Sequence, residues 1–374
     1  MPTWEVHFDC RLDLQNREII SSVATVEALA KVIHGIPLPP ATQRRIDTLN
    51  ILRAIRGTTG IEGTEVSEAE VDAIMRMPQK QVLPEARHRA EQEVRNAAQV
   101  MEFVAATLKQ NPNHVVNEEL IRTIHRLTTQ GIDYPHNEPG VYRSHGVVVG
   151  TYVPPRTNDE VRRLMTRFIE WYNGPPLGWP APIRAVVAHF YLISIHPFGD
   201  GNGRTARGLE SFLLYQGGVN ARGFYSLANY YYQNRSEYVA MLDYVRFETN
   251  DDITPFVRFA LVGLVAEQEM VHQEILADVT IIAFRDFARQ QLDADGKLGT
   301  KPGERMFHFL LGLPDEPVSV MQLRKGGHPL SQLYHGLTAR TLSRDLNYLS
   351  DRELIKIDEH NRIHANVEIM KEFM

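Results

Sequence analysis

Residues 196–207, His-Pro-Phe-Gly-Asp-Gly-Asn-Gly-Arg-Thr-Ala-Arg, place a base, an acid, three glycines and two arginines within twelve positions. Closely spaced glycines allow a tight turn whose backbone N–H groups converge on one anion at the start of a helix. Arg204 and Arg207 are three positions apart, so both lie on one helical turn and can bind phosphate oxygens. The stretch therefore predicts a phosphate-binding loop that leads into a helix.

This loop lies between two predicted helices. The apolar run 183–195 follows Pro182, in the position where proline starts helices, and it stops at His196. Residues 204–215 carry apolar side chains on one face and end at a pair of glycines. Within the loop, Asp200 is a suitable ligand for a magnesium ion that bridges phosphates. His196 can accept a proton from a hydroxyl if its pKa lies near neutral.

Residues 201–206 also fit the loose G-x-G-x-x-A pattern of dinucleotide-binding folds. In such folds an acidic residue that binds the ribose follows about 20 residues later. No Asp or Glu occurs from 211 to 236, and the chain contains no G-x-x-x-x-G-K-[ST] motif. Both observations argue against a dinucleotide site and against a P-loop.

The same twelve residues resemble the HPFxDGNGRxxR signature of the Fic family and match it at every defined position. Members of this family transfer AMP from ATP to hydroxyl side chains of proteins. The resemblance implies that His196 deprotonates the target hydroxyl and that Asp200 holds Mg²⁺ on the α- and β-phosphates. It assigns ATP binding to Gly201, Asn202, Gly203, Arg204, Thr205, Ala206 and Arg207, with the two arginines on the β- and γ-phosphates. Relatives that phosphorylate typically carry Lys in place of Gly203, so this glycine favours AMP transfer.

A second short motif, Thr-Thr-Gly-Ile-Glu-Gly at residues 58–63, lies upstream. From the residues alone, it reads as a glycine-rich turn after a predicted helix at 42–56. In a Fic-like chain it resembles the family's inhibitory [S/T]xxxE[G/N] motif. The resemblance implies that Thr58 and Glu62 share a helical face and that Glu62 pairs with Arg207. A bidentate Arg–carboxylate pair is strong enough to compete with a phosphate.

Residues 140–155 are rich in valine, tyrosine and glycine, and they predict a small β-hairpin in an otherwise helical chain. The simplest interpretation is a structural ribbon. The alternative, which resemblance to the Fic flap also implies, is a flap that docks the target protein. Its edge, at Val147, Val148 and Val149, would pair with an extended segment of the target and place the hydroxyl beside His196.

Residues 229–238 contain three successive tyrosines and an amide. Because the tyrosines recur at helical intervals, a stripe of core residues explains them. The resemblance instead implies an Asn and a Tyr close to the nucleotide, in a similar N-R-x-E-Y setting. It assigns Asn234 to ATP, and Tyr231 and Tyr238 to the wall of the adenine or ribose site.

The chain as a whole is predicted to be mainly α-helical. We expect an N-terminal arm at 1–40, a Fic-type helical bundle with the flap at 41–292, including the inhibitory segment 57–63, and a separate domain at 304–374. In that last domain, three short helices and two strands are typical of a winged helix. Residues 301–374 hold ten Lys and Arg and ten Asp and Glu. This balance favours protein interaction or dimerisation over DNA binding, which needs clustered positive charge.

Composition indicates the class of protein and its expected location in the cell. The chain has 374 residues, a net charge of −6 and one cysteine, Cys10, so it has no disulfide framework within the chain. Its overall charge gives no attraction to nucleic acid or to membranes. We see no apolar run long enough to span a membrane and no N-terminal signal segment. The expectation is a cytoplasmic protein with no membrane partner.

Taken together, these features predict a protein adenylyltransferase held inactive by Glu62. ATP and Mg²⁺ would be its cofactors, and Ser, Thr or Tyr hydroxyls of target proteins and of the chain itself its acceptors. Two alternatives stay open. One is a de-AMPylase in which Glu62 positions water in the same site, and the other is a DNA-binding regulator that senses ATP. The sequence is compatible with a homodimer and names no target.

Overall fold

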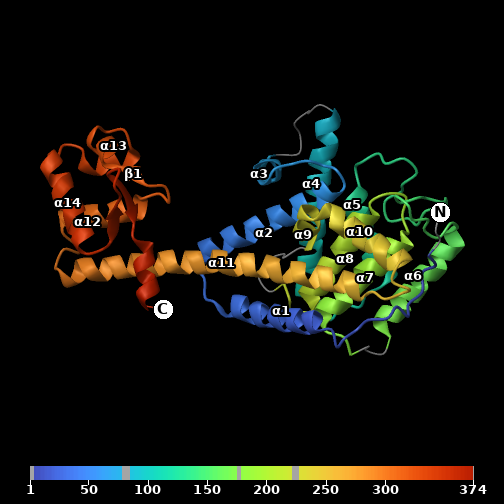
Figure 1. Cartoon of the computed structure of the whole chain (residues 1–374). Coiled ribbons are helices and arrows are strands. Elements are labelled where there is room, and N and C mark those ends of the chain that lie inside the picture. The colour runs from blue at the N-terminus through green and yellow to red at the C-terminus, as the bar shows by residue number, and fades with distance from the viewer. Residues whose placement is uncertain (1–3, 78–84, 175–177, 221–226, 374) are drawn as a thin grey trace. The chain divides into compact units, whose positions relative to one another are not determined.

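The computed structural model describes residues 4–77, 85–174, 178–220 and 227–373. The mainly α-helical fold that the sequence predicts is confirmed (Figure 1). The chain divides into two compact units, Met1–Gln273 and Glu274–Met374. Helices of the first unit are α1 (Arg17–Gly35), α2 (Pro40–Ile61), α3 (Glu68–Arg76), α4 (Glu85–Gln110), α5 (Glu118–Thr129), α6 (Asn158–Asn173), α7 (Ala181–Ile195), α8 (Asn202–Gln216), α9 (Leu227–Gln233), α10 (Arg235–Phe247) and the first part of α11 (Thr254–Ala294).

Local capping signals explain where several helices begin. Ser67 and Thr157 each form a capping box with a glutamate three residues later, at the starts of α3 and α6. The side chain of Asn117 accepts a hydrogen bond from the backbone at the start of α5. These starts follow from neighbouring residues alone, so the sequence predicts them well.

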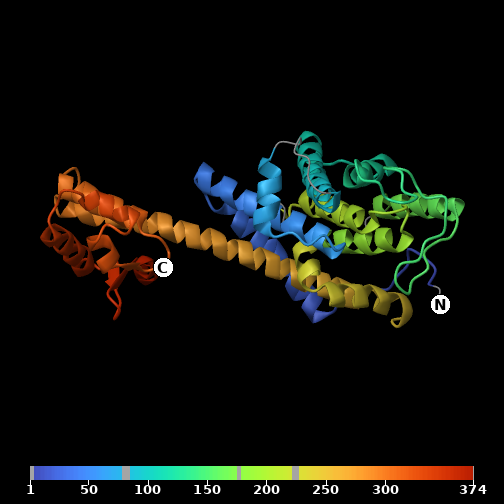
Figure 2. The same ribbon diagram turned by 90° about the horizontal axis from the view of Figure 1, so that it is seen from above.

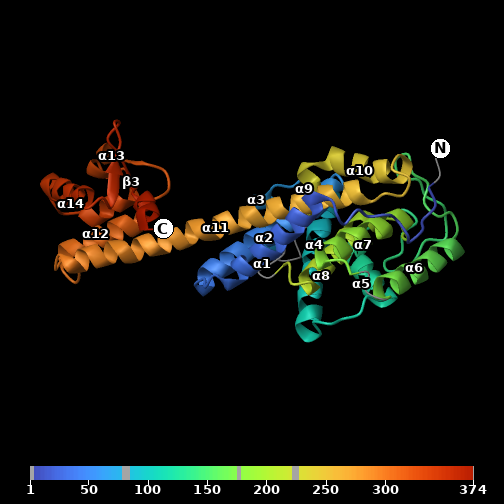
Figure 3. The ribbon, with the colours of Figure 1, turned by 60° about the horizontal axis from the view of Figure 1, so that its bottom comes forward.

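The core of the first unit is built around α7 and α8. Because α7 is apolar on all its faces, nearly every one of its residues is buried. It packs along α8, which in turn contacts α4 and α5 (Figure 3). Helices α4 and α5 also pack on each other (Figure 2). The loop at 196–201 therefore joins two helices that are fixed by the centre of the core.

The end of α2 corrects one reading of the sequence. Residues 57–61 were expected to form a glycine-rich turn, but α2 continues through them to Ile61. The glycines serve close packing, because a Cβ on Gly57 would lie 2.6 Å from the backbone of Ala228 in α9. A Cβ on Gly60 would lie 2.4 Å from the ring of Tyr232. The two glycines allow α2 to lie directly against α9.

This packing predicts that Gly57→Ala destabilises the first unit. The added methyl group would meet main-chain atoms that cannot move aside. We expect a loss of about 1–3 kcal/mol in the free energy of unfolding, the usual effect of overpacking. Gly35→Ala is the matched control, because a Cβ there meets nothing within 4 Å. Denaturant unfolding of the two variants measures the difference, and equal stabilities would contradict the close-packing argument.

The predicted β-hairpin at 140–155 is wrong as a pair of strands. Only Val149 and Tyr152 form an isolated bridge, exchanging two backbone hydrogen bonds of 2.9 Å around a tight turn. The two ends of the segment are joined by a side chain instead, because the buried guanidinium of Arg143 binds the carbonyls of His145 and Pro155. The segment is an extended loop with one tight turn at its tip.

The second unit has its own core. It contains the last part of α11, α12 (Lys301–Gly312), β1 (Val318–Ser319), α13 (Val320–Arg324), η1 (Pro329–Tyr334), α14 (Ala339–Asp351), β2 (Ile355–Ile357), β3 (Arg362–Ala365) and η2 (Val367–Phe373). The strands form an antiparallel sheet in the order β1-β3-β2. The sequence reading missed β1, which has only two residues.

The division between the units differs from the predicted boundary after residue 292. The second unit begins at Glu274, inside α11, because Phe284, Ala288 and Leu292 pack into the core of the second unit. Within the described ranges, no helix combines the length and the apolar character needed to span a bilayer.

Candidate active site

The loop after α7 is held in part by its own residues. His196 ends α7 in the left-handed conformation, with φ 51° and ψ 58°. Gly201 also has a positive φ, 73°, and precedes the first residue of α8. The side chain of Asn202 accepts from the backbone N–H of Phe198 and donates to its carbonyl, both at 2.9 Å. The buried amide of Asn202 thus closes the loop, and the role of this residue in ATP binding stays a prediction.

The imidazole of His196 is set up as a base. Its Nδ1 lies 3.3 Å from the carbonyl oxygen of Ile193, which can only accept, so Nδ1 carries the proton and Nε2 keeps a free lone pair. Burial lowers the pKa of His196 to about 4, and the charges of Arg143 and Arg246 act in the same direction. This value lies below the near-neutral pKa expected from the sequence, so the ring is uncharged at neutral pH and can accept a proton at Nε2, as a weaker base than an ordinary histidine.

His196 lies at a cleft of about 230 Å³. Its lining includes residues from the end of α2, the tight turn of the loop at 149–150, the start of α8, and α10: Ile61, Glu62, Val149, Gly150, Ile193, His196, Gly203, Arg207, Arg235, Tyr238, Val239, Leu242, Asp243 and Arg246. Of the three flap valines, Val149 lines the cleft and Val148 is 58% exposed, while Val147 is partly buried. The cleft thus brings together the two sequence motifs and the loop.

Glu62 and Arg207 form the ion pair that the resemblance implies. The Arg207 Nη2 lies 2.6 Å from Glu62 Oε1, and the same guanidinium donates to the hydroxyl and the carbonyl of Thr58, both at 3.0 Å. Arg207 is 2% exposed. The side chain of Glu62 is 34% exposed, so desolvation opposes its ionisation only in part, and the charges of Arg207 and Arg204 lower the pKa of this carboxyl. The pair is therefore ionised at neutral pH.

The carboxylate of Glu62 also lies against the N-terminus of α8. A Cβ added to Gly203 would be 2.4 Å from Glu62 Oε1, so glycine is the residue that leaves room for the carboxylate. The N-terminus of a helix attracts anions through its free N–H groups and its dipole. Glu62 therefore lies where the sequence predicts that a phosphate binds.

Arg204 is held by residues that the sequence reading did not single out. Its Nη1 donates to the hydroxyl of Tyr134 at 2.7 Å and lies 3.3 Å from Glu93 Oε1, and its Nη2 contacts Asp200 at 3.2 Å. Glu93 is 3% exposed and also binds Thr64, just after Glu62. One signal could have found Glu93: it is a charged residue on the apolar stripe of α4.

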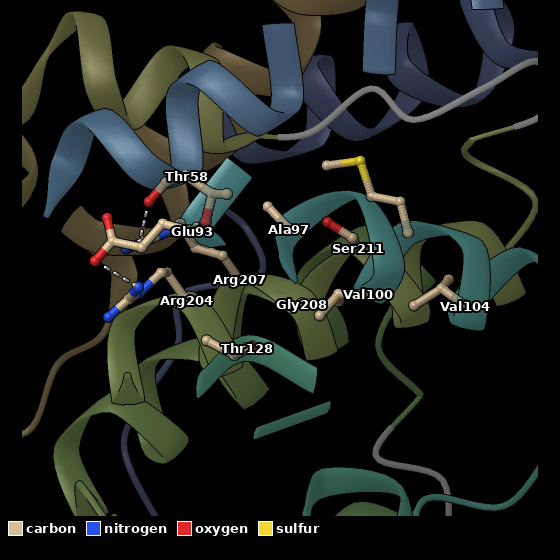
Figure 4. A pocket seen from close by; sticks show the side chains of 11 residues that line it. Thr58, Glu93, Ala97, Val100, Val104, Thr128, Arg204, Arg207, Gly208 and Ser211 are labelled. Atoms are coloured by element: carbon tan, nitrogen blue, oxygen red, sulfur yellow. Dashed lines mark hydrogen bonds and ion pairs between the residues drawn. The ribbon is translucent and has the colours of Figure 1, made fainter. Parts of the chain in front are cut away.

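A small cavity of about 30 Å³ adjoins the two arginines. Figure 4 shows the guanidinium groups of Arg204 and Arg207 at one end, beside Glu93 and Thr58, and apolar side chains such as Val104 at the other. Within the described part of the chain, Arg204 Nε has no hydrogen-bond partner. The cavity beside the arginines is large enough for a water molecule and too small for a nucleotide.

Asp200 suits a magnesium ion that arrives with phosphates. Its side chain is 40% exposed, and its Oδ1 accepts from the backbone of Gly201 at 2.5 Å and from Arg204. Among the described residues, no cluster of three or more His, Cys, Asp or Glu side chains could hold a metal by itself. Mg²⁺ is commonly bound by one or two carboxylates, together with water and substrate phosphates. The residues present fit that arrangement, with Asp200 as the protein ligand.

Three other residues that the sequence assigns to ATP have buried side chains. Thr205, Ala206 and Tyr231 are fully buried. The hydroxyl of Thr205 donates to the carbonyl of Gly201 at 2.8 Å, and that of Tyr231 to Glu210 at 3.0 Å. These side chains lie on the faces of α8 and α9 that point into the core, and their contacts with ATP stay predictions.

Tyr238 and Asn234 have different surroundings. Tyr238 lines the cleft, stacks on Tyr231 with ring centroids 4.5 Å apart, and contacts His189 Nε2 through its hydroxyl at 2.9 Å. Asn234 precedes α10, and its amide donates to the carbonyl of Tyr230 at 3.0 Å. The described lining of the cleft includes Tyr238 and does not include Asn234.

Part of the chain is similar to known proteins. Residues 115–214 match the model of the Fic/DOC family. Two curated relatives, each named protein adenylyltransferase Fic, come from Culex quinquefasciatus and Aedes aegypti. Each is 31% identical over 250 residues, which are 67% of this chain and 44% of the relative. The chain thus spans less than half the length of these relatives.

Two solved structures have a similar fold. A Fic family protein from Desulfovibrio desulfuricans G20 gives a TM-score of 0.55 at 20% identity, covering 98% of both chains. Fic-1 from C. elegans gives 0.58 at 23% identity, covering 71% of this chain and 75% of that one.

Proposed function

Because residues 115–214 of this chain form a Fic/DOC-family domain, we propose that the protein is an adenylyltransferase that moves AMP from ATP to protein hydroxyls and is restrained by Glu62. One observation carries the proposal. The neutral imidazole of His196 lies at the same cleft as Gly203 and Arg207, and the carboxylate of Glu62 lies against both of these residues.

The mechanism follows from the chemistry of these groups. Nε2 of His196 accepts the proton of a Ser, Thr or Tyr hydroxyl as its oxygen bonds to the α-phosphorus of ATP. The bond from the α-phosphorus to the bridging oxygen of the β-phosphate breaks, and pyrophosphate leaves. The N-terminus of α8 and the two arginines stabilise the negative charge of the phosphates. Magnesium held by Asp200 supplies further charge neutralisation when it is bound.

The position of Glu62 supports its role as the restraint. The γ-phosphate and the carboxylate would compete for Arg207, since both bind the same guanidinium. With Glu62 in this position, the cleft has a volume of about 230 Å³, which is smaller than the roughly 300–1,000 Å³ typical of ligand pockets. Displacement of Glu62 would enlarge the cleft and at the same time release Arg207 to bind the γ-phosphate.

The test is covalent transfer from labelled ATP. The chain with Glu62→Gly is incubated with magnesium and ATP labelled at either the α- or the γ-phosphate. We expect α-label on the protein itself and no γ-label, because transfer of AMP retains only the α-phosphorus. Label from γ-labelled ATP would indicate phosphorylation. Absence of both labels, with AMP released from a modified protein only when Glu62 is present, would favour the de-AMPylase.

The activity should be insensitive to pH across the range where histidine usually titrates. His196 acts while neutral, and its lowered pKa means that the ring is half protonated only near pH 4. Glu62 raises this pKa, so Glu62→Gly shifts it further down. We expect single-turnover AMP transfer by the Glu62→Gly chain to stay level from about pH 8 to pH 5 and to fall as the pH approaches 4. An inflection near pH 6.5 would contradict this role of burial.

The loop at 140–155 is proposed to dock the target. Val149 and Gly150 line the cleft and Val148 is exposed beside them, which supports pairing with an extended segment of the target. Because Val148→Pro removes a backbone donor, target modification should fall about 2- to 10-fold, the equivalent of one net hydrogen bond. Val148→Ala keeps the donor and serves as the control. Unchanged modification by a folded Val148→Pro chain would refute docking through this edge.

For the second unit we propose a winged-helix arrangement with α14 as the third helix. The supporting observations are the helices α12, α13 and α14 and the antiparallel sheet β1-β3-β2. The equal numbers of positive and negative residues over 301–374 support a role in protein interaction or dimerisation rather than DNA binding. Salt-dependent binding to one DNA sequence would overturn this assignment.

A further inference from the structure

Arg143 is a buried cation that the proposed mechanism does not use. It lies in the loop after α5 and is 3% exposed. Its guanidinium donates to three backbone carbonyls: Nε to His196 at 2.7 Å, Nη1 to His145 at 2.7 Å and Nη2 to Pro155 at 2.5 Å. These contacts join the catalytic loop to both ends of the segment 145–155.

The partners of Arg143 are unusual for a buried charge. Burial lowers the pKa of the guanidinium, which shows how unfavourable the site is for a cation. In the described ranges, no carboxylate forms an ion pair with it. A buried charge is costly unless its hydrogen bonds are satisfied, and here backbone carbonyls alone satisfy them. A residue that only filled space would not need the charge.

Arg143 also controls the backbone of the His196-Pro197 turn. The N–H of His196 completes α7 by donating to Leu192 at 3.0 Å, and Pro197 has no N–H. The turn therefore offers two remaining backbone groups, the carbonyls of these two residues. The side chain of Arg143 binds the first, and its own N–H donates to the second at 3.0 Å. One residue thus fixes both carbonyls.

The turn needs such support because His196 has a positive φ of 51°. A residue other than glycine persists in this region only where its surroundings hold it there. The conformation directs the imidazole so that Nδ1 meets the carbonyl of Ile193 and Nε2 stays free. Relaxation of the turn would change the direction of the ring and the nitrogen that carries the proton.

We propose that Arg143 is a positioning residue for AMP transfer. It holds the His196 turn in its left-handed conformation and keeps Nε2 free, while it fixes the target-docking segment 145–155 to the same turn. The base and the docking segment are therefore coupled through one guanidinium. This inference rests on the proposed function, in which His196 is the base.

The first measurement is the kinetics of Arg143→Met in the Glu62→Gly chain. We expect kcat for AMP transfer to fall about 10- to 100-fold, the effect of a misplaced catalytic group. The KM for ATP should change less than about 3-fold, because Gly203, Arg204 and Arg207 do not depend on this contact. A change confined to KM for ATP would overturn the proposal.

Arg122→Met provides a matched control. The Nε of Arg122 donates to the carbonyl of Gly140 at 2.6 Å, in the same loop, and its guanidinium lies over the ring of Tyr142. It has no contact with His196 in the described structure. We expect kcat within about 3-fold of the parent chain. If Arg122→Met lowered kcat as much as Arg143→Met, general support of the loop would explain both effects.

The second measurement does not depend on activity. The ring nitrogens of His196 are observed by ¹⁵N NMR at pH 7, in the Glu62→Gly chain with and without Arg143→Met. We expect one tautomer, with the proton on Nδ1, in the first chain and a mixture in the second. An unchanged signal would overturn the proposal. If the Glu62→Gly chain transferred no AMP, the proposed function would fail, and this signal would still decide the role of Arg143.

Arg143→Lys covers the case in which Arg143→Met does not fold. Lysine keeps the charge and can reach one of the three carbonyls. A kcat that is lower than that of the parent chain but still measurable, together with a mixed tautomer signal, supports the proposal. Full activity with a single tautomer would overturn it.

Discussion

Glu62→Gly is expected to raise AMP transfer about 10- to 100-fold over the unmodified chain. The substitution removes a charged hydrogen bond of 2.6 Å to Arg207, and such bonds contribute about 1.5–3 kcal/mol. It also clears the carboxylate from the N-terminus of α8, next to Gly203. The measurement is the initial rate of incorporation of α-labelled ATP at fixed magnesium and target concentrations.

Two variants make this result specific. Glu65→Gly removes an exposed carboxylate three residues further along and should leave the rate unchanged. Glu62→Gln keeps a polar side chain and loses the charge, so an intermediate rate is expected. Equal rates for Glu62→Gly and the unmodified chain, with ATP bound in both, would show that Glu62 is not the restraint.

His196→Ala, introduced into the Glu62→Gly chain, is expected to lower AMP transfer by about 10²- to 10⁴-fold, the usual contribution of a general base. The free Nε2 of His196 is lost, while Asp200, Arg204 and Arg207 remain. Binding of ATP should therefore change little, which isothermal titration can measure. This pairing of a lost rate with retained binding identifies a group that acts on the reacting atoms.

The control for this variant is His88→Ala, which removes an exposed histidine of α4. Thermal unfolding of all three chains shows whether the fold is retained. A folded double variant that transfers AMP as fast as Glu62→Gly alone would exclude His196 as the base.

Features that depend on neighbouring residues were predictable from the sequence. The capping boxes at Ser67 and Thr157 and the start of α8 follow from spacing alone. The ion pair between Glu62 and Arg207 was predicted only through the resemblance to known motifs. Nothing in the local sequence links these two residues, which lie far apart in the chain.

Features that depend on tertiary packing were not predictable. Tyr231 and Tyr238 both lie on predicted helices, yet only Tyr238 lines the cleft, because the face that each helix buries depends on its neighbours. The shape of the segment 140–155 was also not predictable locally, since one side chain, that of Arg143, joins the two ends of the segment. Glu93 and Arg143 carry no motif, and only the folded chain brings them to Arg204 and His196.

The proposed restraint is covalently part of the protein that it restrains. Glu62 ends a helix that packs directly on α9 through Gly57 and Gly60, so the carboxylate stays near Arg207 whatever the concentration of the protein. Its inhibition would be unimolecular, and dilution would not weaken it, unlike inhibition by a separate protein or a second subunit. The fraction of active molecules would then depend on how well ATP competes with the carboxylate, and the same fraction would hold at every level of expression.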